Sequence, residues 1–188
     1  LGCIVPSFGA YLYYYQIEVT GFTQWQYSLL SLIGYGTLTT GSICYSIYFK
    51  QNEFRQMVML ACFINFIGAT TTMLFCLGIT FGIPNFLFVI MTSTVTDTLY
   101  MAFAKLPLMV LYAKVIPQKI EASMFAFLMG LSNLSNLFIA KNWANLLNAV
   151  FVGCTRDNLA EKTWQLYALQ AVCSTFPVFF IWLVPKRP

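Results

Sequence analysis

The chain contains no histidine, so it lacks the commonest metal ligand, the usual haem ligand and the usual general base. Its six cysteines are scattered, mostly within apolar runs, and they form no C-x-x-C pair. Isolated cysteines in apolar runs are typical of small buried hydrophobic side chains. The sequence therefore predicts neither a metal site nor a cofactor.

Three motifs that support common enzyme chemistry are also absent. The chain has no G-x-x-x-x-G-K-[ST] phosphate loop, no H-E-x-x-H zinc motif and no G-x-S-x-G nucleophile motif. Aspartate and glutamate together number only 6. Because histidine is absent and acids are few, we expect no catalytic residues and no enzyme activity.

Charged residues are scarce, at 9% of the chain, whereas about 25% is usual in a soluble domain. Hydrophobic residues make up 59% of the sequence. This composition predicts an integral membrane protein whose main partner is the lipid bilayer. The net charge of +4 is too small to indicate nucleic-acid binding.

Long apolar runs, separated by short polar segments, predict an all-α polytopic membrane protein with six transmembrane helices in one bundle over residues 1–188. The first run reaches only about 24 Å, short of a hydrocarbon core of about 30 Å. Because the chain also lacks an initiator methionine, we expect it to be a fragment or a processed product. The expected helices span about 1–16, 24–49, 54–80, 85–116, 120–148 and 163–184.

The positive charges are unevenly distributed between the two sides of this topology. Six lysines and arginines belong to the second and fourth connections and the C-terminus, whereas two belong to the fifth connection. Positive residues gather on the cytoplasmic side of membrane proteins. We therefore expect both termini on the cytoplasmic side, or on its stromal or matrix equivalent.

Residues 93–136 form the most informative stretch, because polar residues interrupt two long apolar runs there. Asp97 and Lys105 lie where hydrocarbon would surround them, and a charge at the bilayer centre costs about 2.5–3.5 kcal/mol. Such residues persist where they face a bundle interior or a water-filled path. Our working hypothesis is that this hairpin lines a solute pathway.

A helical wheel brings Asp97, Tyr100 and Lys105 within a sector of about 140°. Asp97 and Lys105 are separated by about 12 Å along the axis, too far for a simple ion pair. Lys105 could attract an anionic group while Asp97 serves as a proton or cation site. Alternatively, the two charges could form a structural pair, or pair with other helices.

Two amides, Asn133 and Asn136, share one stripe of the next expected helix. They could bind a polar solute, or they could form hydrogen bonds between helices worth about 0.6–2 kcal/mol each. Lys141 lies toward the far end of that helix, where we expect it to extend to the membrane interface.

Glu121 opens the same helix, just after the turn at Pro117. An acid in a first turn is stabilised by the helix dipole. Alternatively, Glu121 could make a gating contact with Lys114 or Lys119 at the cytoplasmic mouth.

Several residues and short motifs of this hairpin together form a family pattern. They are Asp97, Leu106-Pro107, Ala113-Lys114 before Pro117, Glu121-Ala122, Phe125-Ala126-Phe127-Leu128-Met129 and Ser132-Asn133. In this pattern the sequence resembles the folate–biopterin transporter family, a branch of the major facilitator superfamily. Weaker similarity covers residues 13–15, 21–23 and 157–185.

The resemblance implies that the whole chain is similar to the C-terminal six-helix half of such a transporter. It further implies a solute site between two halves and a folate- or pterin-like anionic solute, with coupling to protons as one option. The alternative is a transporter-derived accessory subunit, whose inner polar face other membrane subunits would bury.

Overall fold

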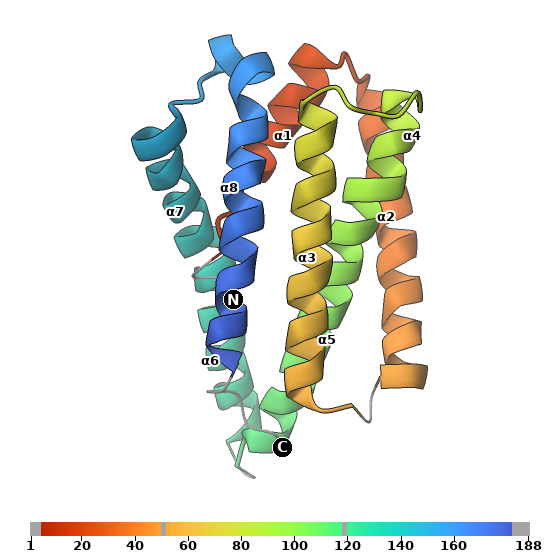
Figure 1. The fold of residues 1–188 in the computed structure, drawn as a ribbon. Coiled ribbons are helices and arrows are strands. Elements are labelled where there is room, and N and C mark those ends of the chain that lie inside the picture. The colour runs from red at the N-terminus through yellow and green to blue at the C-terminus, as the bar shows by residue number, and fades with distance from the viewer. Residues whose placement is uncertain (1–4, 50–51, 118–119, 182–188) are drawn as a thin grey trace.

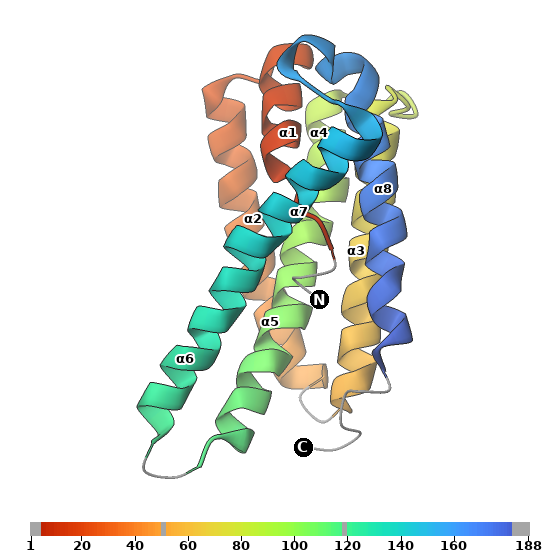
Figure 2. The ribbon, with the colours of Figure 1, turned by 90° about the vertical axis from the view of Figure 1, so that its left-hand side faces the viewer.

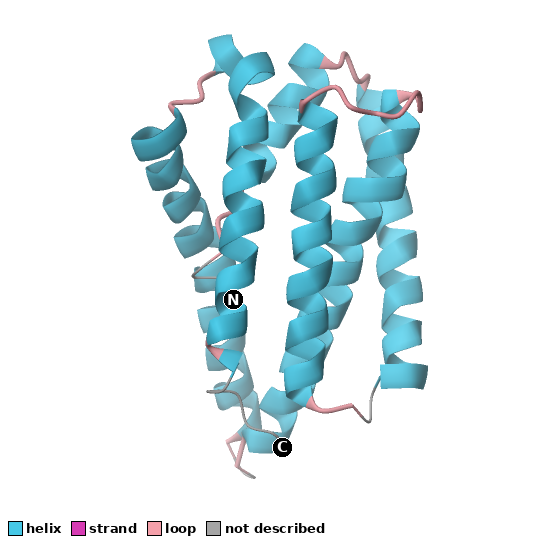
Figure 3. Cartoon of the chain, in the orientation of Figure 1, coloured by secondary structure: helices cyan, strands magenta, loops and turns pink. Residues whose placement is uncertain are grey.

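The computed structural model describes residues 5–49, 52–117 and 120–181, and these residues form helices and loops with no β-strand among them (Figure 3). The helices are arranged in six continuous runs, several of which combine α-helical and π-helical turns. They are α1 Gly9–Tyr14 with η1 Tyr15–Val19; α2 Gln24–Cys44 with η2 Tyr45–Phe49; α3 Phe54–Cys76; α4 Asn85–Val89 with η3 Ile90–Thr94 and α5 Val95–Val115; α6 Glu121–Asn133 with η4 Leu134–Ile139, α7 Ala140–Leu147 and η5 Asn148–Val152; and the 3₁₀ turn η6 Arg156–Asn158 followed by α8 Leu159–Phe179.

Among the described helices, three are long and apolar enough to cross a membrane, judged by length and composition. They are Phe54–Cys76, Asn85–Ala113 and Glu121–Val152. The first run, Gly9–Val19, is much shorter than a span of about 20 residues.

The start of the chain differs from the expected helix over 1–16, of which residues 1–4 lie outside the described part. Residues 5–8 are not helical and run beside α7 at mid-height of the bundle (Figure 2). The amide of Ser7 donates to the carbonyl of Ala140 at 3.2 Å, and the Tyr167 hydroxyl donates to the carbonyl of Phe8 at 3.4 Å. Other helices thus take up this segment's hydrogen bonds, so the helix begins only at Gly9.

Other helix ends also differ from the expected bounds, for local reasons. The third run ends at Cys76 because Gly78 adopts a φ of 75°, and the fifth continues to Val152, where Gly153 has a φ of 63°. Glycine in this left-handed region commonly ends a helix. α8 begins at Leu159, four residues before the expected start, after the η6 turn with its Thr155–Asn158 capping box.

α3 occupies the centre of the bundle, where it packs against both α5 and α8, while α2 packs against α5 (Figure 1). Most buried side chains gather at the end of the bundle that carries loops 20–23, 77–84 and 153–158, which we call the loop end. Phe8, Val89 and Leu166 are among the most deeply buried residues of this core. A smaller cluster of Tyr45, Met57 and Phe103 lies toward the opposite end, which we call the turn end.

Polar contacts reinforce the loop end. The buried Asn148 amide donates to the carbonyl of Cys154 at 2.9 Å and accepts from its N–H at 2.7 Å, which satisfies a sharp turn after η5. Arg156 forms an ion pair with Glu18 at 3.5 Å and so connects this loop to η1. By contrast, no residue of α6 or η4 is buried, and this arm leans away from α8 (Figure 2).

α3 and α5 approach closely at Gly68. A methyl group at this position would lie 2.7 Å from the Thr96 hydroxyl oxygen and 3.7 Å from Oδ1 of Asp97. The Thr96 hydroxyl donates to the carbonyls of Thr92 at 2.7 Å and Ser93 at 3.2 Å, so it cannot easily turn aside. The absence of a side chain at Gly68 therefore sets the spacing of the two helices beside Asp97.

This contact predicts that Gly68→Ala lowers the free energy of unfolding by about 1–3 kcal/mol, because the added methyl group overpacks the α3–α5 contact. The matched control is Gly36→Ala, where the new methyl group meets nothing within 4 Å. Its higher helix propensity favours folding by up to about 1 kcal/mol. Denaturant unfolding of both purified variants in detergent measures the difference, and equal stabilities would contradict the packing role of Gly68.

Candidate solute-binding cavity

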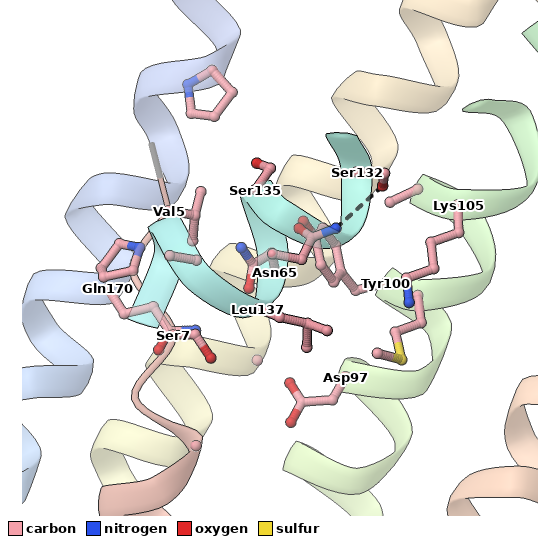
Figure 4. A pocket seen from close by; sticks show the side chains of 18 of the residues that line it. Val5, Ser7, Asn65, Asp97, Tyr100, Lys105, Ser132, Ser135, Leu137 and Gln170 are labelled. Carbon is pink, nitrogen blue, oxygen red and sulfur yellow. Dashed lines mark hydrogen bonds between the residues drawn. The ribbon is translucent and has the colours of Figure 1, made fainter. Parts of the chain in front are cut away.

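A cavity of about 770 Å³ lies between α3, α5 and α8 on one side and the arm formed by α6, η4 and α7 on the other (Figure 4). Residues 5–9 form part of its wall. We call it the central cavity. Its volume is in the range of about 300–1,000 Å³ that is usual for small-molecule sites.

The structure brings all five side chains that the sequence predicts to bind solute to the wall of this cavity. Three are carried by α5 and two by α6 and η4. They are Asp97, Tyr100, Lys105, Asn133 and Asn136. Solute binding by these residues stays a prediction, whereas their arrangement around one cavity is a feature of the fold.

Asp97 and Lys105 both have exposed side chains, and neither forms an ion pair or hydrogen bond with any other described residue. Figure 4 shows the Lys105 side chain extending along α5 toward the level of Asp97. Helical side chains lean toward the N-terminus of their helix, which accounts for this direction. The structure therefore shows no direct charge pair, and both charges are available to a solute or to water.

The two asparagines of the arm do not connect helices within the described part of the chain. The Asn136 amide donates to the Ser132 hydroxyl at 3.4 Å, within the same helical run, and Asn133 makes no hydrogen bond to another described helix. The π-helical turns of η4 alter the helical register just after Asn133. Such turns are frequent at functional sites.

The proposed gating contact lies mostly beyond what the structure describes. Glu121 is exposed in the first turn of α6. Lys119 lies outside the described residues, and Lys114 is described only as part of α5, without its side chain. A contact between Glu121 and either lysine therefore stays a prediction.

Among the described residues, the structure adds three charged or amide side chains that the sequence analysis did not assign to the site. Lys141 lines the cavity, whereas the sequence analysis expected it to extend to the membrane interface. Asn65 on α3 and Gln170 on α8 also belong to the wall. An amide within an apolar run, the signal that identified Asn133, would also have identified Asn65.

Among the described residues of the cavity wall, the charged side chains are one carboxylate, Asp97, and two ammonium groups, Lys105 and Lys141. This surplus of positive charge favours an anionic solute. Aromatic side chains, including Tyr100 and Tyr112, add surfaces on which a flat ring could stack. Among the described residues, no group of three or more histidine, cysteine or acidic side chains could hold a metal ion.

Known proteins similar to this chain are transporters by name. Probable folate-biopterin transporter 4 of Arabidopsis thaliana is 25% identical over 97% of this chain and 37% of its own length. Probable folate-biopterin transporter 7 of the same plant is 28% identical over 93% of this chain and 39% of its own length. Probable folate-biopterin transporter 2 is 24% identical over 84% of this chain and 31% of its own length.

The chain thus spans 31–39% of the length of these curated relatives. No solved structure gives a significant match to it. Its apolar helices and its transporter relatives identify an integral membrane protein. The family model described as the BT1 family matches residues 1–188, and the chain belongs to this family of membrane transporters.

Proposed function

We propose that this chain is the C-terminal six-helix half of a secondary transporter of the major facilitator type, which moves anionic solutes resembling folate or pterins. Membership of the BT1 family and the names of the relatives support this proposal. The observation that carries it is the central cavity, whose wall contains an acid and a base that have no partner among the described residues. Charged groups inside an apolar bundle mark a solute or ion pathway.

In this proposal the two charges of α5 have different roles. Lys105 attracts the anionic group of the solute, and Lys141 strengthens the positive field on the opposite wall. Asp97 binds the coupling proton or cation. Tyr100, Asn133 and Asn136 line the space in which the ring of the solute lies.

The proposed six-span topology places both termini and the turn end on the cytoplasmic side. The cavity reaches this end, because Phe54 at the start of α3 and Tyr112 near the end of α5 belong to its wall. The loop end, in contrast, contains the main core. This asymmetry fits a conformation that is closed toward the loop end and open toward the cytoplasm.

A second half is proposed to complete the site, as in transporters with a solute site between two halves near the midplane. The arm of α6 and η4, which has no buried residue, would face it. An accessory subunit would also need this face covered. However, the relatives reported above are transporters by name and do not favour that alternative.

Labelling of introduced cysteines tests the topology. On a background without the natural cysteines, Asn52→Cys should react with an impermeant maleimide only from the cytoplasmic side, because it precedes α3 at the turn end. Asp157→Cys, in the loop between η5 and α8, should react only from the opposite side. Reaction of both from one side would contradict six spans with cytoplasmic termini.

Replacing Lys105 by glutamine should weaken the binding of pterin-6-carboxylate by about 10–100-fold, because a hydrogen bond to a charged group is lost. Binding of pterin, which has the same ring without the carboxylate, should change by less than about twofold. Equilibrium titration of the full-length protein in nanodiscs measures both affinities. An equal loss for the two probes would remove the anion-binding role from Lys105.

Replacing Asp97 by asparagine should reduce proton-driven uptake of pterin-6-carboxylate at least about tenfold, because the side chain no longer binds and releases a proton. Solute exchange without a gradient should continue. Asp157→Asn, which removes an exposed acid outside the cavity, is the matched control. Unchanged gradient-driven uptake in the Asp97 variant would exclude a coupling role.

A further inference from the structure

Among the described residues, Asn65 is the most deeply buried polar residue of the cavity wall that has no hydrogen-bond partner. Asn65 is 8% exposed, and its side chain makes no hydrogen bond to any described residue. An amide carries two N–H donors and a carbonyl acceptor, all of which need partners when they are removed from water. The Asn65 amide therefore has its full capacity for a ligand.

The position of Asn65 follows from the close contact between α3 and α5. Asn65 lies one turn from Gly68, and the two helices run in opposite directions (Figure 1). Because Gly68 lies against Thr96 and Asp97, one turn toward the turn end brings Asn65 to the level of Tyr100. Asn65 therefore lies on the part of the cavity wall that α3 forms, beside the part of the wall that contains Asp97 on α5.

A second amide faces the cavity from α8. The Oε1 atom of Gln170 is buried and has no hydrogen-bond partner among the described residues. In the view of Figure 4, Asn65 lies between Gln170 and Tyr100. Among the described residues Gln170 Oε1 is the one buried side-chain polar atom without a partner, whereas the Asn65 amide keeps some exposure in the cavity wall. A buried polar atom without a partner is unusual, because such groups are nearly always paired. The two amides lie on helices that pack against each other.

We propose that Asn65 and Gln170 form a hydrogen-bonding wall that recognises the lactam edge of a nitrogen heterocycle, where a ring N–H stands beside a carbonyl. A side-chain amide presents a donor and an acceptor side by side and so pairs with such an edge through two hydrogen bonds. The inference rests on the proposed function and adds to it. Asn65 and Gln170 bind the neutral ring of the solute, and Lys105 binds its anionic group.

A pair of probes that differ only at this edge provides the test. Pterin has the lactam N–H, whereas 3-methylpterin replaces it with N–CH₃ and leaves the rest of the ring unchanged. The full-length protein in nanodiscs should bind 3-methylpterin at least about tenfold more weakly than pterin. In Asn65→Leu, the ratio of the two dissociation constants should fall to within about twofold of unity, because the pairing amide is gone.

Two further variants make the result decisive. Gln170→Leu should also lower the ratio and provides a second reading if Asn65→Leu does not fold. Asn142→Leu is the matched control, because Asn142 is an exposed amide outside the cavity whose side chain donates to the Phe138 carbonyl, and it should keep the native ratio.

The outcomes separate this inference from the proposed function. If the native protein discriminates between the probes and a folded Asn65 or Gln170 variant keeps the native ratio, the amide wall is overturned while a pteridine site stands. Equal losses of both probes in a variant would mean a structural role and would also overturn it. If the native protein binds neither probe, the proposed solute class fails and the amide wall fails with it.

Discussion

The contact between Gly68 and Thr96 determines how the two central helices of this protein meet. With only a hydrogen atom at Gly68, α3 approaches α5 closely enough that a methyl group there would lie 2.7 Å from the Thr96 hydroxyl oxygen. Small residues allow such approaches in membranes, where lipid supplies no hydrophobic drive between helices. Close to this contact, Asn65 on α3 and Asp97 and Tyr100 on α5 line the cavity.

The second constraint is the uneven distribution of packing. The main core, the Asn148 turn and the ion pair of Arg156 with Glu18 all hold the loop end together. α6 and η4 bury no residue, so the bundle opens along this arm. Charged and amide side chains line the resulting cavity because they can be solvated there, whereas the lipid-facing surface would leave them without partners.

The cavity can bind a polar ligand because several polar side chains in its wall have no partner among the described residues. Asp97, Lys105 and Asn65 have no hydrogen bond or ion pair with other described residues, although each lies in a predominantly apolar helix. Asp97 and Lys105 are exposed at the cavity, where water can solvate them, and the amide of Asn65 keeps its hydrogen-bonding groups available there. A solute with complementary groups, as proposed above, would satisfy all three.

Several properties were predictable because they depend on the chain alone. Low charge and long apolar runs predicted a helical membrane protein. The sequence also identified Asp97, Lys105, Asn133 and Asn136, because polar groups in hydrocarbon are costly and are therefore uncommon there. The resemblance around Asp97 and Pro117 predicted the family, which the comparison over residues 1–188 confirms. Helix ends were less accurate, since glycine φ angles, a capping box and hydrogen bonds to distant helices decided them.

The sequence by itself therefore determined that the protein belongs in a lipid bilayer. It also identified the polar residues of α5, α6 and η4 that are unusual in apolar helices. Only the tertiary structure decided that these residues share one cavity, that Asn65, Lys141 and Gln170 join them, and that Asp97 and Lys105 do not pair. The physical reason is that helical periodicity specifies a direction around one axis, whereas a cavity requires the relative placement of several axes. That placement arises from contacts between residues far apart in the chain, such as Gly68 with Thr96 and Ser7 with Ala140.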